Sequence, residues 1–316
     1  MSLHEVAGSP PGFQGEPIQA TLLDCLSDIL RHDRLVPVFQ PIVDLQRGTL
    51  VGYEGLIRGP SGSPLRSPLD LFRVAGENGL TIELELRCCQ TLLRRFAGLG
   101  LPGQLFLNIG APALPRLARD GKAMALNLES LGLAPARIVL ELTEHSVHDR
   151  EHFPGLLASY RGAGFQLAID DLGEGYSSLR RWSEFKPEYV KVDMYFVRDV
   201  HLDSLKQQFL RSIRDIALES GAVVVAEGIE QVEELQFLRG IGIPGGQGFY
   251  IGMPESRPFV SVPGPLLCEL SRHMDEHKPT PASAAGKARA GGYRPEVSDC
   301  PPMQVQPSLA PRDTAA

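Results

Sequence analysis

The sequence has few of the features of a disulfide-stapled or membrane-spanning protein. Its 316 residues include five cysteines, an odd number, and two of these, Cys88 and Cys89, are adjacent. A disulfide framework is therefore not expected, which fits a reducing compartment. No apolar run approaches the roughly 20 residues of a bilayer span, and the amino end lacks the charged-then-apolar pattern of a signal peptide. We expect a cytoplasmic protein without membrane contact.

Positive charge is also scarce, since 31 Lys and Arg stand against 38 Asp and Glu and give a formal net charge of −7. Sequence-independent binding to a DNA or RNA duplex needs clustered basic residues that meet the phosphates. The composition argues against such a partner. An anionic substrate would have to be met by local cations instead.

The two ends of the chain differ from its middle. Residues 1–16 are rich in Gly and Pro without periodicity and predict a flexible arm. Residues 276–316 are dominated by Pro, Ala, Gly and Ser, which bury too little apolar area to order a chain, and predict a disordered tail. The middle, residues 17–275, has the length of one α/β barrel, about 250 residues.

Within that middle, short β-rich runs alternate with helical patterns, as in βαβ units of a parallel sheet. Helical spacing predicts a helix before the first strand, one after Thr81 and one that ends at Gly221. The last has these apolar residues on one face: Leu205, Phe209, Ile213 and Ala217. Composition alone permits a doubly wound open sheet as well as a barrel. The runs predict strands near residues 37–43, 50–56, 104–109, 137–142, 165–170, 188–192, 222–226 and 246–250.

Six acidic or amide side chains stand at the ends of these runs. Strand exits converge on one mouth of a (β/α)₈ barrel, so these side chains would meet there. Carboxylates that share a dry pocket need cations to neutralise them, and hard ions such as Mg²⁺ or Mn²⁺ prefer oxygen ligands. The six residues are Glu54, Asn108, Glu141, Asp170, Asp171 and Glu227.

Short motifs around these residues follow a known order. The segment Glu54-Gly55-Leu56-Ile57-Arg58 resembles the name-giving motif of the EAL-domain family, bacterial phosphodiesterases that open cyclic di-GMP. The resemblance extends over roughly residues 24–258. The other matching motifs are Gln40-Pro41-Ile42, Asn108, Glu141-Leu142-Thr143-Glu144, Asp170 to Ser178, Lys191-Val192-Asp193, Glu227-Gly228-Ile229-Glu230 and Gln247-Gly248-Phe249.

The resemblance implies an irregular TIM-like barrel whose first strand runs antiparallel. It also implies a site for two Mg²⁺ or Mn²⁺ ions that act on a phosphodiester. Glu227 matches a carboxylate that serves either as a ligand or as the acceptor of the water's proton. Lys191 matches a residue that orients the attacking water, and a structural ion pair is compatible with that role. The matched metal ligands are Glu54, Asn108, Glu141 and Asp170 for one ion, and Asp171 and Asp193 for the other.

The remaining matches concern the substrate and one loop. Arg58 can hold a phosphate through two hydrogen bonds, the alternative being a surface arginine. Gln40 and Gln247 match positions near the guanine and phosphate groups, the alternative being rim amides. Glu144 matches the anchor of the loop after the fifth strand. Glu174 departs from the family, where threonine is usual, and we expect its charge to repel Glu144.

These matches imply hydrolysis of cyclic di-GMP to the linear dinucleotide pGpG. The first alternative is a weak or inactive receptor that binds cyclic di-GMP and acts through a protein partner, although no metal ligand is missing. The second is an enolase-type enzyme, which would not explain Arg58. We find no sensory or cyclase domain, so the resemblance leaves room for a regulatory protein in trans and for a homodimer.

Overall fold

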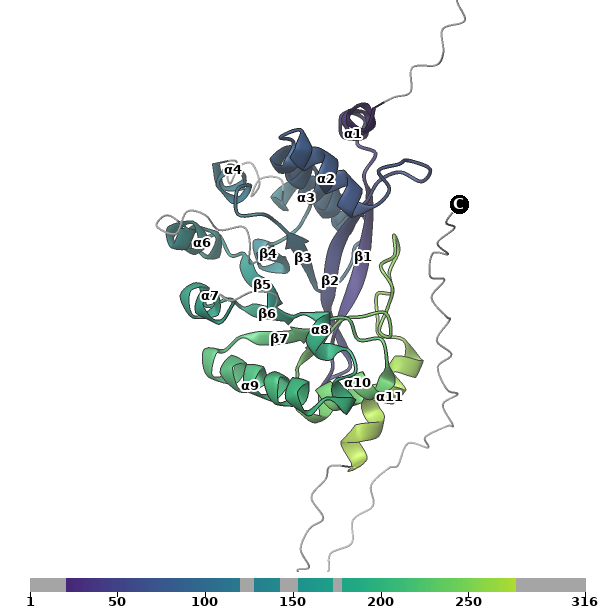
Figure 1. Cartoon of the computed structure of the whole chain (residues 1–316), viewed down its shortest axis with the longest axis vertical. Helices are drawn as coiled ribbons and strands as arrows, with labels where there is room; N and C mark the ends of the chain where they lie inside the picture. The colour runs from purple at the N-terminus through teal and green to yellow at the C-terminus, as the bar shows by residue number, and fades with distance from the viewer. Residues whose placement is uncertain (1–20, 120–127, 143–152, 173–177, 277–316) are drawn as a thin grey trace, which may run out of the picture.

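The chain forms a closed barrel of eight strands that follow one another in sequence order from β1 to β8. The computed structural model describes residues 21–119, 128–142, 153–172 and 178–276. β1 runs antiparallel to both of its neighbours, β2 and β8, whereas successive pairs from β2 to β8 are parallel. The expected irregular (β/α)₈ barrel with an antiparallel first strand is confirmed (Figure 1).

Helices surround the barrel, and the long β1–β2 ribbon runs from α1 at one end toward α10 and α11 at the other (Figure 1). The strands are β1 (Val36–Asp44), β2 (Thr49–Arg58), β3 (Gln104–Asn108), β4 (Ile138–Leu142), β5 (Gln166–Leu172), β6 (Tyr189–Val192), β7 (Val223–Ala226) and β8 (Gly245–Gly246). The helices are α1 (Leu22–Arg31), α2 (Pro68–Glu77), α3 (Thr81–Gly98), α4 (Leu114–Arg119), α6 (Phe153–Gly162), α7 (Ser178–Phe185), α8 (Met194–Val197), α9 (Ser204–Ser220), α10 (Val232–Gly240) and α11 (Gly264–Glu276), with 3₁₀ turns η1 (Pro135–Arg137) and η3 (Val200–Leu202).

Local sequence explains where the helices begin and end. Thr21 caps α1, because its hydroxyl accepts from the Asp24 amide while the Asp24 carboxylate accepts from the Thr21 amide. Gly221 ends α9 as expected, with φ of 74°, a conformation that glycine adopts without strain. The prediction that Leu205 belongs to the apolar face of α9 was wrong, because this side chain lies in the first turn and is 78% exposed. β8 is also shorter than expected, with only two residues.

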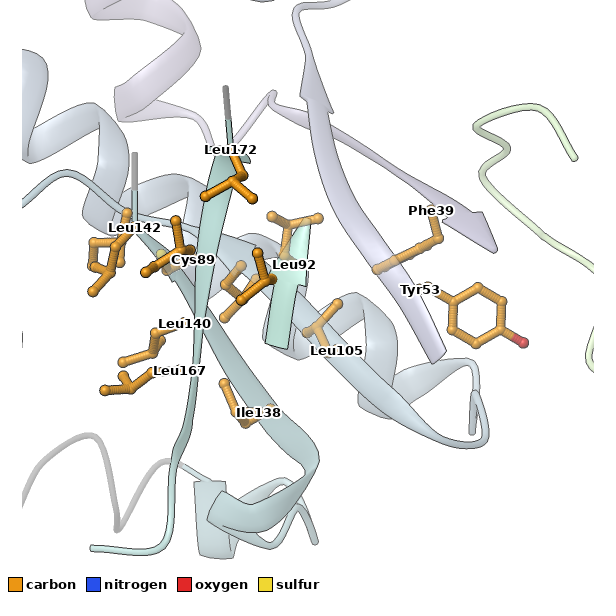
Figure 2. Close-up of a cluster of buried hydrophobic side chains, with 14 of the residues drawn as sticks. Phe39, Tyr53, Cys89, Leu92, Leu105, Ile138, Leu140, Leu142, Leu167 and Leu172 are labelled. Carbon is orange, nitrogen blue, oxygen red and sulfur yellow. The ribbon is translucent and has the colours of Figure 1, made fainter. Parts of the chain in front are cut away.

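The core has two layers because side chains alternate along each barrel strand. The outer layer lies between the strands and the helices, and Figure 2 shows part of it, with Cys89 and Leu92 of α3 among Leu105, Leu140 and Leu167 of β3, β4 and β5. The inner layer fills the barrel with a small apolar cluster, whose buried members are Ile42, Phe106, Val139, Ala168 and Val225.

Two expectations concern the ends of the chain and membranes. The predicted arm, residues 1–16, and residues 277–316 of the predicted tail lie outside the described residues. Within the part of the chain that is described, no helix combines the length and the apolar character needed to cross a bilayer.

An aromatic cluster joins α3 to the β1–β2 ribbon, and we expect its loss to destabilise the fold. The Phe96 ring is fully buried, with its centroid 6.2 Å from that of Phe39 and 6.3 Å from that of Tyr53. Phe96→Ala should lower the free energy of unfolding by about 3–5 kcal/mol, because it leaves a cavity and removes these contacts. Urea denaturation measures the loss. Leu69→Ala is the control, since Leu69 is 83% exposed, and equal effects of both changes would contradict this role of Phe96.

Candidate active site

Because side chains alternate along each strand, the predicted site residues lie together inside the mouth of the barrel. Five of the predicted site residues stand two positions after a residue that faces the barrel interior. Because side chains alternate along a strand, each site residue also faces inward, one layer nearer the mouth. Each polar side chain therefore stands above an apolar or aromatic floor. The successive floor and site residues are Phe106 and Asn108, Val139 and Glu141, Ala168 and Asp170, Tyr189 and Lys191, and Val225 and Glu227.

A bulge in β5 turns two adjacent carboxylates to the same side. Neighbouring residues of a regular strand face opposite ways, but the pairing of β5 with β6 shifts register between Ile169 and Leu172. Asp171, within the bulge, has φ of 54°, a left-handed conformation that aspartate tolerates better than most residues. As a result, Asp170, Asp171 and Glu227 each place a carboxylate oxygen within 4.8 Å of the others.

The antiparallel first strand brings amides to the same site. Gln40 pairs directly with Glu54, so both side chains lie on the inner face of the β1–β2 ribbon. Gln247 bridges them, with its Nε2 donating to Glu54 Oε2 at 2.6 Å and to Gln40 Oε1 at 3.0 Å. Asn108 Nδ2 donates to the other oxygen of Glu54 at 2.8 Å. Glu54 is therefore held in one orientation.

The Lys191 side chain is 1% exposed and its ammonium stands at the centre of four carboxylates. Its Nζ lies 2.8 Å from Glu141 Oε1, 2.9 Å from Glu227 Oε1, 3.1 Å from Asp170 Oδ1 and 3.5 Å from Glu54 Oε2. One ammonium compensates only one of four carboxylate charges. The cluster thus has a deficit of positive charge in a place where water does not screen it.

The pKa shifts within the cluster reflect its burial and its shortage of positive charge. Burial, with further contributions from Glu54 and Asp170, raises the pKa of Glu141 well above its usual value although Lys191 opposes the rise. Burial also raises the pKa of Glu227. Burial lowers the pKa of Lys191, but its carboxylate neighbours outweigh burial and raise it. The pKa of Glu54 is lowered, because Lys191, Gln247 and Asn108 overcome the effect of its burial.

The donor set fits divalent cations with oxygen ligands. Glu141 Oε2 is buried and accepts no hydrogen bond from the described residues, so an acceptor oxygen remains for a cation. Asp171 and Asp193 border the same cleft as Glu54 and Glu227. Asp193 also caps α8 by accepting from the Tyr195 amide at 2.8 Å, which fixes one carboxylate oxygen and leaves the other available.

The cleft at the mouth has a volume of about 300 Å³. Several residues that line it were given no role in the sequence, although Glu230 belongs to a matched motif and Phe249 follows Gln247-Gly248. Those residues are Leu56, Met194, Glu230 and Phe249. The signal that was available is their position, since Leu56 lies near the end of β2 and the other three lie within four residues of the ends of β6, β7 and β8.

Other predicted residues are not gathered as closely. Arg58 ends β2, is not among the cleft-lining residues, and donates from Nη1 to the Ile57 carbonyl at 2.9 Å. Burial lowers the pKa of Arg58. The negative charge of Glu54 opposes this effect, because it favours the protonated guanidinium. Glu144 and Glu174 lie outside the described residues, so their expected repulsion stays a prediction.

Curated proteins and solved structures resemble this chain. It is 32% identical over 236 residues to the cyclic di-GMP phosphodiesterase PdeR of Escherichia coli, covering 72% of this chain and 35% of PdeR. The chain spans about a third of the length of such curated relatives.

Solved structures share the fold. A manganese/cyclic di-GMP complex of Klebsiella pneumoniae BlrP1 has 31% identity and a TM-score of 0.66, covering 72% of this chain and 58% of that one. A cyclic di-GMP-bound standalone EAL protein of Vibrio cholerae has 28% identity and a TM-score of 0.63, covering 72% of this chain and 94% of that one.

The family model for the EAL domain matches residues 24–254, which contain the whole barrel from β1 to β8 and every residue of the carboxylate cluster. This chain belongs to the EAL-domain family.

Proposed function

We propose that this protein hydrolyses one phosphoester bond of cyclic di-GMP to give linear pGpG, using two Mg²⁺ or Mn²⁺ ions. The observation that carries the proposal is the convergence of four carboxylates on Lys191 at the mouth of an EAL-domain barrel. The Mn²⁺ and cyclic di-GMP in the BlrP1 structure support it. A cytoplasmic location, a homodimer and a regulatory partner remain predictions.

Each part of the cluster has a proposed task. Bound divalent ions supply an activated water and stabilise the leaving oxygen. Their proposed ligands are Glu54, Asn108, Glu141, Asp170, Asp171 and Asp193. Glu227 takes the proton of the attacking water, because its carboxylate lies at the mouth within 4.8 Å of the carboxylates of Asp170 and Asp171. Lys191 opposes protonation of its carboxylate neighbours and donates a hydrogen bond to the water.

Substrate contacts come from the rim. Gln247 Oε1 is buried without a hydrogen-bond partner among the described residues and is available to accept from guanine. Gln40 lies beside it. Phe249 and Met194, 50% and 37% exposed, offer apolar surface on which a base can pack. Arg58 reaches a phosphate by leaving its contact with the Ile57 carbonyl.

The function is tested with purified protein, cyclic di-GMP and Mn²⁺, with products separated by chromatography. The parent should form pGpG, and Glu54→Ala should form none, because the change removes a carboxylate to which Asn108 and Gln247 both donate. A melting curve checks that the variant is folded. Binding of cyclic di-GMP without turnover by the parent would identify a receptor and reject the hydrolase.

Glu227→Gln separates chemistry from binding. Removal of the proton acceptor should lower turnover by about 100-fold or more, whereas cyclic di-GMP should still bind because its contacts come from other residues. Turnover and calorimetric binding are measured side by side. Glu219→Gln, an exposed change on α9, is the matched control. A folded Glu227→Gln protein that fails to bind, or one that turns over normally, contradicts this division of roles.

Lys191→Met tests the charge balance of the site. Loss of the ammonium leaves four carboxylates without their cation, so the free energy of unfolding should fall by about 3–5 kcal/mol in chelator. Mn²⁺ should recover part of the loss, since the ion supplies the missing charge. Denaturation with and without Mn²⁺ is compared with that of Lys186→Met, which removes an exposed ammonium. Equal stability of parent and Lys191→Met protein in chelator would refute the dependence on this lysine.

A further inference from the structure

Glu234 is a buried carboxylate outside the cluster around Lys191. It lies in the first turn of α10, and only 1% of its surface is exposed. A buried carboxylate has to replace its bound water with other donors, or its burial is costly. The identity of those donors shows what this side chain does.

Three backbone amides donate to Glu234. Oε1 accepts from the Asp199 amide at 2.9 Å, and Oε2 accepts from the amides of Glu230 at 2.9 Å and Gln231 at 3.0 Å. Asp199 follows β6, whereas Glu230 and Gln231 follow β7. We call residues 193–199 the β6 exit segment and residues 227–231 the β7 exit segment. One side chain thus ties both segments together.

Both exit segments form the wall of the cleft. Asp193 and Met194 line it from the β6 exit segment, and Glu227, Gly228 and Glu230 line it from the β7 exit segment. The two backbones come close, because a Cβ on Gly228, which has φ of 69°, would lie only 2.4 Å from Met194 Cβ. A small relative shift of the segments therefore changes the separation of Asp193 and Glu227.

At the strand ends, the Glu227 amide donates to the Val192 carbonyl at 3.1 Å, which continues the β6–β7 ladder. Beyond it, the other polar links between the exit segments are weak. Arg198 Nη2 lies 3.7 Å from Glu230 Oε1, and Gln231 Nε2 lies 3.4 Å from Asp199 Oδ1, both at the exposed surface. Asp199 itself has φ of 57°, a conformation that needs support from its surroundings. The hydrogen bonds of Glu234 are shorter, partly buried and accepted by a charged group, so they are stronger than these two surface links.

We propose that Glu234 is a positioning residue that locks the β6 and β7 exit segments together and so sets the spacing between Asp193 and Glu227. Its effect on metal binding rests on the proposed function, whereas the lock itself does not. Glu234 is not among the residues that line the cleft. It acts through the backbone that carries the residues of the site.

The test compares the parent with Glu234→Gln in the full chain, with Glu233→Gln as the matched control because Glu233 is exposed on the same turn. The amide of the new glutamine keeps one oxygen acceptor and turns an NH₂ group toward a backbone donor. Hydrogen exchange should accelerate roughly tenfold or more at the amides that face the new NH₂ group, which are either that of Asp199 or those of Glu230 and Gln231. Exchange in α3 should not change. Glu234→Ala, where it folds, should have the larger effect.

The second readout is the Mn²⁺ dependence of turnover. Glu234→Gln should need a severalfold higher Mn²⁺ concentration for half-maximal rate, which a general loss of stability would not cause in protein that remains folded at the assay temperature. Unchanged exchange in both exit segments overturns the lock, whatever the activity. Faster exchange with unchanged Mn²⁺ dependence overturns the positioning role. Absence of turnover in the parent counts against the proposed function alone, since the exchange result still decides the lock.

Discussion

The ion pairs of Lys191 are the interaction on which the mouth of the barrel depends. Its ammonium is the common neighbour of carboxylates from β2, β4, β5 and the exit of β7. Without it, four like charges would meet in a place of low dielectric, and their repulsion would open the strand ends or force protonation. One lysine at the end of β6 therefore lets the barrel close over an acidic interior, while leaving enough negative charge to attract divalent ions.

Along the same strands, outward side chains stabilise the barrel, and inward side chains at the mouth form the candidate active site. Outward residues such as Leu105, Leu140 and Leu167 pack against helices and supply the apolar burial that holds the barrel closed. Inward residues are fewer and change from apolar at the floor to charged at the mouth. Because the two sets alternate residue by residue, a change at the mouth need not disturb the packing outside. This separation explains why the barrel tolerates an acidic cluster at its mouth.

The alternation of β-rich runs with helical patterns predicted the strands, and their ends indicated the residues at the mouth. Closure of the sheet into a barrel came only from the resemblance to the EAL-domain family, because composition also permits an open sheet. Lys191, a charge inside an apolar strand, could be expected to face acids. The orientation of Asp171 could not, because it depends on a bulge that only the pairing with β6 reveals. The burial of Leu205 was wrongly predicted, because helical spacing does not show that the first turn of α9 leaves this side chain exposed. Glu234 escaped notice because an acid early in a helix usually indicates a cap, and its link to Asp199 is long-range.

The antiparallel β1 also determines how the barrel responds to mechanical force. Since Val36 pairs with Arg58 at the mouth and Asp44 pairs with Thr49 at the far end, the chain enters the barrel beside the cleft. Only residues 32–35 separate α1 from β1. Tension on α1 away from the barrel would load the Val36–Arg58 end first and peel the ladder one pair at a time toward Gln40 and Glu54. The first part of the fold to yield under such a pull would therefore be the wall of the site.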